Sequence, residues 1–172
     1  MSSSNKKSLI AYYSRKGQNY LDGNIVNLTV GNTEVIAKKI QAITGADLFE
    51  IETVNPYPID YTETTRIAKK ELKANARPEL SNSVENMKTY DVIYLGYPNW
   101  WGTFPMAVFT FLESYDFTGK TIIPFCTHEG SGMGGMRDIC KLCPNAKIEN
   151  GIAIKGGSVN SSDGVVKVWL LK

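Results

Sequence analysis

The sequence is poor in cysteine and histidine, has no long apolar run and carries no excess of one charge. Three cysteines and one histidine in 172 residues leave one cysteine without an internal partner and supply no second pair of cysteines or histidines for zinc, so no metal site is expected. A net charge of +2, without a basic run, argues against nucleic-acid binding. No stretch is long enough to cross a bilayer or to form a signal-peptide h-region. We therefore expect a cytoplasmic protein with no membrane or nucleic-acid partner.

The composition and the hydrophobic pattern of the sequence predict a globular chain in which strands alternate with helices. Hydrophobic residues make up 42% of the chain, which favours a single domain spanning residues 1–172. Short apolar runs predict five strands, at about 7–13, 47–52, 91–97, 121–126 and 147–154. Helical periodicity predicts five helices. The first two span about 33–44 and 61–74, the third begins at about 103, the fourth ends at about 142, and the last includes residues 165–170. This alternation implies a doubly wound α/β fold, with a five-stranded parallel sheet in a three-layer α/β/α arrangement.

Local signals set the faces and ends of these elements. Residues 18–31 interrupt the loop after the first strand, and Asp22-Gly23 within them lies between apolar pairs, which predicts a β-hairpin. Asp60 and Glu63 form a capping box for the second helix. The first helix is expected to bury Val35, Ile36, Ile40 and Ile43; the third, with Pro105 in its first turn, is expected to bury Ala107, Val108, Phe111 and Leu112.

The loop after the first strand has the composition of a phosphate site. Ser14 can donate through its hydroxyl, Arg15 or Lys16 adds positive charge, and Gly17 lets backbone N–H groups approach an anion closely. The next helix begins near Asn32-Thr33, where free N–H groups would complete the cradle.

Two further loops are expected at the same edge of the sheet, because the carboxyl ends of parallel strands meet there. The loop after the third strand contains Trp100 and Trp101, on which a flat aromatic group could stack. The loop after the fourth strand, residues 127–132, offers glycines, hydroxyls and His128. Phosphate at one end and a flat ring at the other describe a mononucleotide-like cofactor.

These segments resemble the flavodoxin family. The resemblance is carried by residues 11–17 (AYYSRKG), 32–34 (NTE), 97–102 (YPNWWG), 112–121 (LESYDFTGKT) and 124–132 (PFCTHEGSG), and it covers nearly the whole chain. It implies a strand order of 2-1-3-4-5, non-covalently bound FMN and electron transfer. Typical flavodoxins are strongly acidic, whereas this chain has net charge +2, which argues against the acidic docking face that they use.

The resemblance also assigns residues to the two ends of FMN. It places the phosphate on Ser14, Lys16, Gly17, Asn32 and Thr33. Because residues 18–31 separate the two halves of the phosphate motif, Gln18 or Asn19 is a further candidate donor. The isoalloxazine ring would be flanked by Pro98, Asn99, Trp100, Trp101 and Gly102 on one side, and by Thr127, His128, Glu129, Gly130, Ser131 and Gly132 on the other.

Two other motifs favour structural roles. Cys140 and Cys143 match C-x-x-C, but the redox form of that motif requires the N-terminus of a helix, and here the pair closes a helix before Pro144. Gly130-x-Gly132-x-x-Gly135 matches a dinucleotide fingerprint with Glu149 as its acidic residue. The first glycine lies too far from the strand, and Glu149 falls too early in the next one.

Three functions remain compatible with the sequence. The first is an FMN-binding electron carrier, in which the protein supplies binding, orientation and electrostatics. The second is an FMN-dependent NAD(P)H:quinone-type oxidoreductase, which needs a pocket above the ring. The third is a flavin-free binding module. It is disfavoured because all three loops contain residue types suited to binding a phosphate or a flat ring. The expected partners are redox proteins or small quinone-like acceptors, and the chain is expected to be a monomer or a homodimer.

Overall fold

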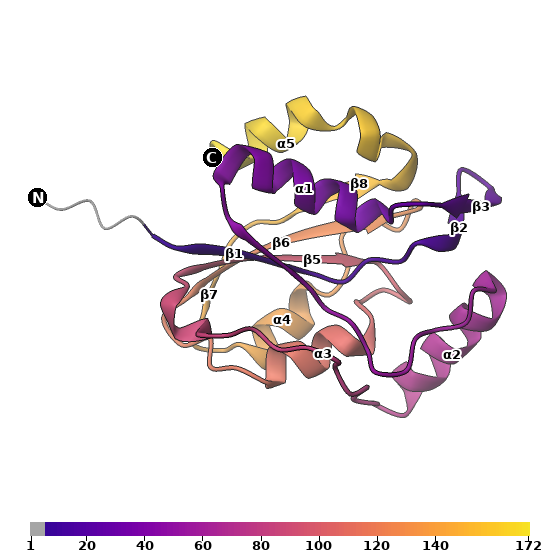
Figure 1. The fold of residues 1–172 in the computed structure, drawn as a ribbon, viewed down its shortest axis with the longest axis horizontal. Coiled ribbons are helices and arrows are strands. Elements are labelled where there is room, and N and C mark those ends of the chain that lie inside the picture. Colours follow the sequence, from indigo (N-terminus) through magenta and orange to yellow (C-terminus); the bar gives the residue numbers. More distant parts are fainter. Residues whose placement is uncertain (1–5) are drawn as a thin grey trace, which may run out of the picture.

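The computed structural model describes residues 6–172. A parallel β-sheet forms the centre of the protein (Figure 1). Its strands are β1 (Ser8–Tyr12), β4 (Asp47–Glu50), β5 (Val92–Pro98), β6 (Thr121–His128), β7 (Lys147–Ile148) and β8 (Ile152–Lys155). Their order is β4-β1-β5-β6, and both β7 and β8 pair with the outer side of β6. This arrangement confirms the predicted order 2-1-3-4-5 for the parallel sheet.

The fifth strand differs from its prediction as one continuous element over 147–154. Ile148 pairs with Ile122, and Ile152 pairs with Phe125, so four steps along this strand match three steps along β6. One extra residue must therefore be accommodated, as in a β-bulge. Gly151 lies at the irregular point, where a Cβ atom would come within 2.6 Å of the Pro124 carbonyl oxygen.

Helices cover both faces of the sheet. They are α1 (Asn32–Thr44), α2 (Tyr61–Lys73), α3 (Met106–Glu113), α4 (Met136–Leu142) and α5 (Asp163–Leu170), with short 3-10 helices at Met87–Thr89 and Gly156–Ser161. Helices α1 and α5 lie on one face and α3 and α4 on the other, while α2 extends past the carboxyl ends of the strands (Figure 1). Among the described residues, no helix combines the length and apolar character needed to span a membrane.

Successive side chains of β1 point to opposite faces of the sheet, so the apolar core is divided into two clusters. Ile10 and Tyr12 belong to the apolar cluster with α1 and α5, whereas Leu9 and Ala11 belong to the cluster with α3. The third helix buries Ala107, Val108, Phe111 and Leu112 as predicted, but it begins at Met106, because Pro105 has an extended ψ of 145° and stands as its N-cap. Ile43 was predicted to be buried and is instead 45% exposed, because it lines the open groove between α1 and α5.

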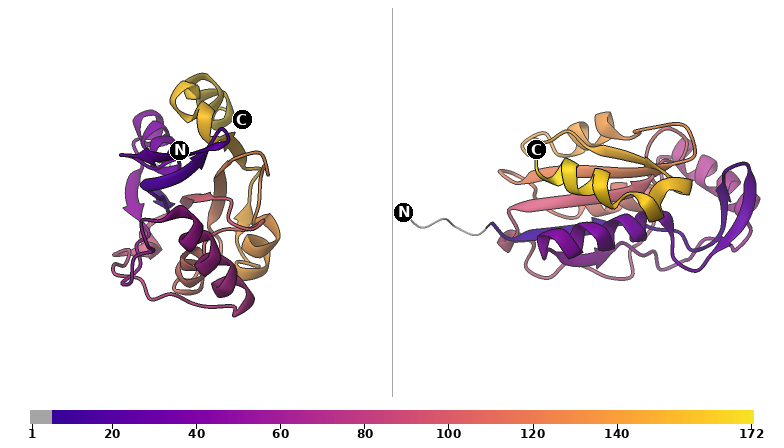
Figure 2. Two further views of the ribbon diagram at one scale, coloured as in Figure 1. Left: turned by 90° about the vertical axis from the view of Figure 1, so that its right-hand side faces the viewer. Right: turned by 90° about the horizontal axis from the view of Figure 1, so that it is seen from above.

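An antiparallel hairpin stands at the carboxyl edge of the sheet, where residues 18–31 interrupt the loop. It pairs β2 (Gly17–Leu21) with β3 (Asn24–Leu28). Asp22 and Gly23 in its turn have φ values of 48° and 90°, which is the type I′ geometry that Asp-Gly favours. The turn is tied to the sheet by an ion pair of 2.7 Å between Asp22 and Lys155 and by the Asp22 N–H, which donates to Glu129. Figure 2 shows the hairpin projecting beyond the strand ends.

Gly31 fixes how closely the loop after β1 approaches α1, and we expect Gly31→Ala to destabilise the protein by about 1–3 kcal/mol. A Cβ atom there would lie 2.2 Å from Ser14 Oγ and 2.6 Å from the Arg15 carbonyl oxygen. Chemical denaturation measures the effect. The control is Gly164→Ala in α5, where nothing lies within 4 Å and alanine favours the helix by about 1 kcal/mol. Equal stability of Gly31→Ala and wild type would contradict the close approach.

Candidate functional site

Two adjoining cavities lie at the carboxyl edge of the sheet, where the three chemically unusual loops meet. The inner cavity, of about 190 Å³, is lined by the start of α1 and the ends of β5 and β6. The outer cavity, of about 410 Å³, lies between α2 and the loop after β5, and its size is ordinary for a small-molecule pocket. Both are lined by Arg15, Asn19, Tyr61, Asn99 and Trp100. These shared residues join the two cavities into one candidate site.

The structure gathers most of the predicted site residues around these cavities. The lining residues among them are Arg15, Asn32, Thr33, Pro98, Asn99, Trp100, Trp101, Thr127, His128, Glu129 and Ser131. Three members of the predicted phosphate motif, Ser14, Lys16 and Gly17, instead line a different cavity of about 270 Å³ beside Glu50 and Glu52. Arg15 lines this cavity as well as the two cavities of the candidate site. Ser14 nevertheless stays in contact with the other half of the motif, because its Oγ accepts the Glu34 N–H in the first turn of α1.

Arg15 is the cation that the first loop presents to the candidate site. Its Nε donates to the Gln18 carbonyl at 3.0 Å, and its Nη2 donates to the carbonyls of Pro58 and Ile59 at 2.9 and 2.8 Å. Neutral oxygens accept all three bonds, so the positive charge is oriented without being neutralised. Asn19 supports the same loop by donating to the carbonyls of Arg15 and Gly17.

The N-terminus of α1 supplies unpaired donors beside Arg15. Gly31 precedes the helix and has no side chain to cap it, so Ser14 Oγ accepts the Glu34 N–H at 3.1 Å from the neighbouring loop. The backbone N–H groups of Asn32 and Thr33 make no hydrogen bond with any other residue of 6–172. Two free N–H groups at a helix N-terminus form a ready site for an anion.

A buried hydroxyl pair connects this helix end to β6. Thr33 Oγ1 and Thr127 Oγ1 lie 2.8 Å apart, and the two residues are 2% and 4% exposed. Thr127 lies in the strand itself, because β6 continues to His128 instead of ending at the predicted Cys126. The pair therefore locks the start of α1 against the end of the central sheet.

Thr33→Val is expected to lower the free energy of unfolding by about 1–3 kcal/mol, because it leaves the buried Thr127 hydroxyl without its partner. Replacing both residues in Thr33→Val/Thr127→Val removes both polar groups and should cost less than the single change. Denaturant unfolding of the two single variants and the double variant measures this coupling. Strictly additive effects would show that the hydroxyl pair contributes nothing.

The loop after β5 turns sharply at its two tryptophans. Trp100 and Thr103 exchange both backbone hydrogen bonds, at 2.9 and 3.2 Å, around Trp101 and Gly102, whose φ values are 56° and 86°. This is again a two-residue turn with positive φ at both positions. Asn99 fixes the turn, because its Oδ1 accepts the Gly102 N–H. A tryptophan at positive φ is strained, and such strain is concentrated at ligand-binding sites.

The two tryptophans have different surroundings. Trp100 packs edge-on against Tyr13 and Tyr57, with ring centroids 5.5 and 5.3 Å apart. Tyr57 donates to Glu71 at 2.5 Å, and burial together with that carboxylate holds the Tyr57 pKa well above its usual value. Trp101 is 51% exposed, donates from its indole nitrogen to the Thr65 carbonyl at 3.0 Å, and therefore ties α2 to the loop.

The loop after β6 completes the site. His128 Nδ1 accepts the Gly130 N–H at 2.9 Å, so a neutral imidazole carries its proton on Nε2. Asn99 donates to the Gly132 carbonyl, and the hydroxyl of buried Tyr97 donates to the Gly134 carbonyl at 2.7 Å. The third loop is thus held by β5 and by the loop that follows it. The Oε1 atom of Glu129 is buried without a hydrogen-bond partner among the described residues.

Residues 25–171 match the flavodoxin model Flavodoxin_4.

The chain belongs to the flavodoxin family.

Solved structures agree with this assignment. A protein from Bacteroides eggerthii, assigned as a flavoprotein, is 29% identical with a TM-score of 0.77, and 96% of each chain is covered. A second, from Bacteroides uniformis, is 27% identical with a TM-score of 0.75, covering 97% of this chain and 99% of its own. A flavoprotein from Lactobacillus acidophilus solved in complex with FMN shares the fold at 20% identity and a TM-score of 0.65, covering 92% of this chain and 99% of its own. No curated protein matches the chain.

Sequence reasoning missed the part of this flavodoxin's site that comes from α2. Tyr61, Thr64, Thr65 and Ala68 line the outer cavity, although the sequence predicted only a helix here, with no role in the site. Gln18, predicted to face phosphate, instead accepts the Tyr61 N–H on its side-chain oxygen at 2.9 Å. Spacing alone could not reveal this contact, because the two residues lie 43 positions apart.

Glu149 and the Cys140/Cys143 pair line neither cavity of the candidate site. Glu149 donates its N–H to the Ile122 carbonyl, near the start of β6 and so away from the carboxyl edge that a dinucleotide would occupy. Burial raises the pKa of Cys143 to about 11, which disfavours the reactive thiolate. Residues 6–172 contain no cluster of three or more metal-ligating side chains.

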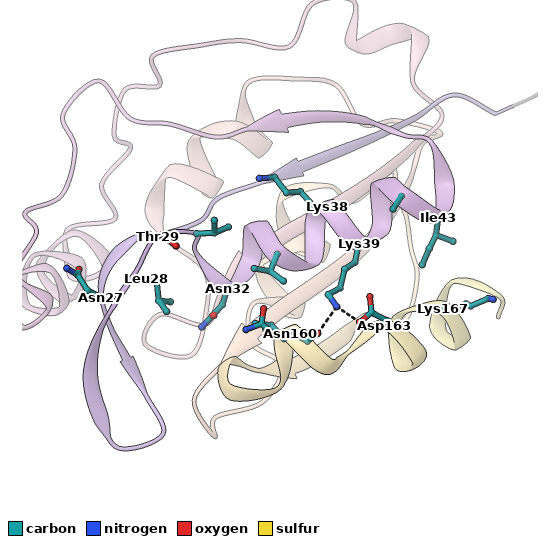
Figure 3. Close-up of a pocket in the computed structure, with 14 residues that line it drawn as sticks. Asn27, Leu28, Thr29, Asn32, Lys38, Lys39, Ile43, Asn160, Asp163 and Lys167 are labelled. Carbon is teal, nitrogen blue, oxygen red and sulfur yellow. Dashed lines mark hydrogen bonds and ion pairs between the residues drawn. The ribbon is translucent and has the colours of Figure 1, made fainter.

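A groove of about 760 Å³ lies between α1 and α5 and shares only Asn32 with the lining of the candidate site. Figure 3 shows Lys39 within it, reaching across from α1 toward α5. Its ammonium donates to the Asn160 carbonyl and forms an ion pair of 2.5 Å with Asp163. Because Lys39 is already paired within the protein, it is not available to bind an anion in this groove.

Proposed function

We propose that this chain binds FMN without a covalent bond and transfers electrons between redox partners. One observation carries the proposal: free helix N–H groups, an oriented guanidinium and a half-buried tryptophan line one connected pair of cavities. The 29% and 27% identity to proteins assigned as flavoproteins supports a flavin ligand, as does the complex with FMN described for the Lactobacillus protein.

The residues suit the two ends of FMN. Arg15 and the N–H groups of Asn32 and Thr33 would hold the phosphate, through charge and helix-terminal donors. Trp100 and the loop from His128 would flank the ring, where an aromatic face stacks well. Bound FMN would supply reversible acceptance of one or two electrons; the protein would orient the ring and limit its access to water.

Reconstitution tests this proposal. Purified protein is stripped of bound ligand, mixed with FMN and passed through a desalting column, and its absorbance is then recorded. We expect a flavin spectrum that co-elutes with the protein and bleaches on reduction with dithionite. A protein peak without flavin absorbance would favour the flavin-free binding module instead.

The second candidate, an FMN-dependent NAD(P)H:quinone-type oxidoreductase, is favoured by the outer cavity. Helix α2 and Trp101 enclose this space beside the inner cavity, and a small acceptor could occupy it. Steady-state oxidation of NADH or NADPH by a benzoquinone distinguishes the two functions. Turnover at about 1 s⁻¹ or faster is expected of an enzyme; reduction of bound FMN by dithionite without such turnover is expected of a carrier.

A further inference from the structure

Helix α2 has two chemically different faces. Tyr61, Thr64, Thr65 and Ala68 face the outer cavity. Arg66, Lys69, Lys70 and Lys73, at spacing i, i+3, i+4 and i+7, share one side of the same helix and are all exposed. These four cations, here called the basic stripe, run for about 10 Å along the helix axis, at 1.5 Å per residue.

The positive charge of the basic stripe is largely unbalanced. Arg66 is paired with Glu63 at 2.8 Å, but Lys69, Lys70 and Lys73 form no ion pair with any residue of 6–172. The other nearby acid of the helix, Glu71, turns inward to the Tyr57 hydroxyl. Cations in the last turn complement the helix dipole, yet Lys69 lies before the last turn and has no such role.

An exposed aromatic side chain adjoins the basic stripe at the mouth of the site. Lys69 Nζ lies 4.7 Å from the centroid of the Trp101 ring, which is 51% exposed and lines the outer cavity. An exposed aromatic group among cations is typical of a recognition surface.

We propose that the basic stripe and Trp101 form a docking surface for an acidic one-electron donor protein. Charge complementarity selects the partner, because three unpaired lysines attract a carboxylate-rich surface and steer its approach. This inference rests on the proposed function. In each encounter the partner gives one electron to the bound flavin and is itself oxidised by one electron. A docked partner would lie against α2, the outer wall of the candidate flavin site.

Other anionic partners fit less well. A stripe of about 10 Å matches only about three phosphates of one DNA strand, at 3.4 Å per phosphate. The chain as a whole has net charge +2, so it lacks the broad basic surface of a nucleic-acid-binding or membrane-binding protein.

The test uses FMN-loaded protein and an acidic [2Fe–2S] ferredoxin as the probe. Two triple variants are compared with wild type: Lys69→Gln/Lys70→Gln/Lys73→Gln in the stripe and Lys88→Gln/Lys141→Gln/Lys172→Gln elsewhere. The control lysines are equally exposed, and both triples remove three charges. Flavin absorbance and circular dichroism are recorded first. Absence of bound flavin in wild type refutes the proposed function and is thereby distinguished from failure of the docking inference.

Stopped-flow mixing then measures the second-order rate constant for reduction of the bound flavin by reduced ferredoxin. For wild type this constant should fall as salt rises, because the encounter is steered by charge. At low salt the stripe triple should lower it about tenfold, and the control triple less than about twofold. Equal rates in the two triples, or a wild-type rate that is undetectable or insensitive to salt, would overturn the inference. So would stripe-dependent micromolar binding to duplex DNA or to phosphatidylserine vesicles, because the surface would then serve another partner.

Discussion

Trp100→Ala is expected to reduce the free energy of unfolding by about 3 kcal/mol and to weaken FMN binding by about tenfold or more. Trp100 packs edge-on against both Tyr13 and Tyr57, so truncation leaves a cavity beneath the candidate ring site. The same change removes the aromatic face that would contact the flavin. Denaturant unfolding and fluorescence titration with FMN measure the two effects separately.

The adjacent tryptophan provides a matched control. Trp101 is 51% exposed, and its tertiary contacts are one hydrogen bond to Thr65 and one cation–π contact with Lys69. Trp101→Ala should therefore cost only about 1 kcal/mol of stability. If the two substitutions were equally damaging, the different roles assigned to the neighbouring tryptophans would be wrong.

Arg15→Met is expected to raise the Kd for FMN by about tenfold or more, through loss of a cation beside the phosphate. It also removes the three hydrogen bonds to the carbonyls of Gln18, Pro58 and Ile59. The segment before α2 should then loosen, and stability should fall by about 2 kcal/mol, since the released carbonyls are only partly buried. Calorimetric titration with FMN and thermal unfolding measure the two effects.

Lys16→Met distinguishes a local role of Arg15 at the phosphate from the general effect of removing one positive charge. Lys16 carries the same charge one residue away but lines the cavity beside Glu50 and Glu52. Its removal should change the Kd for FMN by less than about twofold, because Lys16 lines neither cavity of the candidate site and a partly screened charge outside it contributes little. A larger loss with Lys16→Met than with Arg15→Met would place the phosphate in the cavity beside Glu50 and Glu52 instead.

Much of the fold could be predicted from local pattern. Buried strands such as 91–97 are continuous apolar runs, and short loops between alternating elements leave few topologies open. The Asp22-Gly23 turn was predictable because its positive φ values suit these two residue types. The break between β7 and β8 was not, because it arises from a one-residue mismatch with β6 that only the paired strand reveals.

The candidate site was predictable at the level of loops and less so at the level of side chains. Parallel strands end at one edge, so the positions of Trp100 and His128 followed from the topology. Which cation lines the candidate site did not follow, because Arg15 and Lys16 are neighbours in sequence and Arg15 is held there by the distant carbonyls of Pro58 and Ile59. The contribution of α2 depends on contacts such as Trp101 with Thr65, which no spacing in the sequence encodes.

Comparing FMN, riboflavin and FAD in one titration of ligand-free protein tests the central claim most directly. If Arg15 and the start of α1 hold a terminal phosphate, FMN should bind with a Kd of about 1 μM or lower, and riboflavin, which lacks that phosphate, about 100-fold more weakly. FAD should also bind more weakly than FMN, because its phosphate is extended by a second nucleotide. Equal affinity for FMN and riboflavin, tighter binding of FAD, or no binding of any flavin would contradict the account.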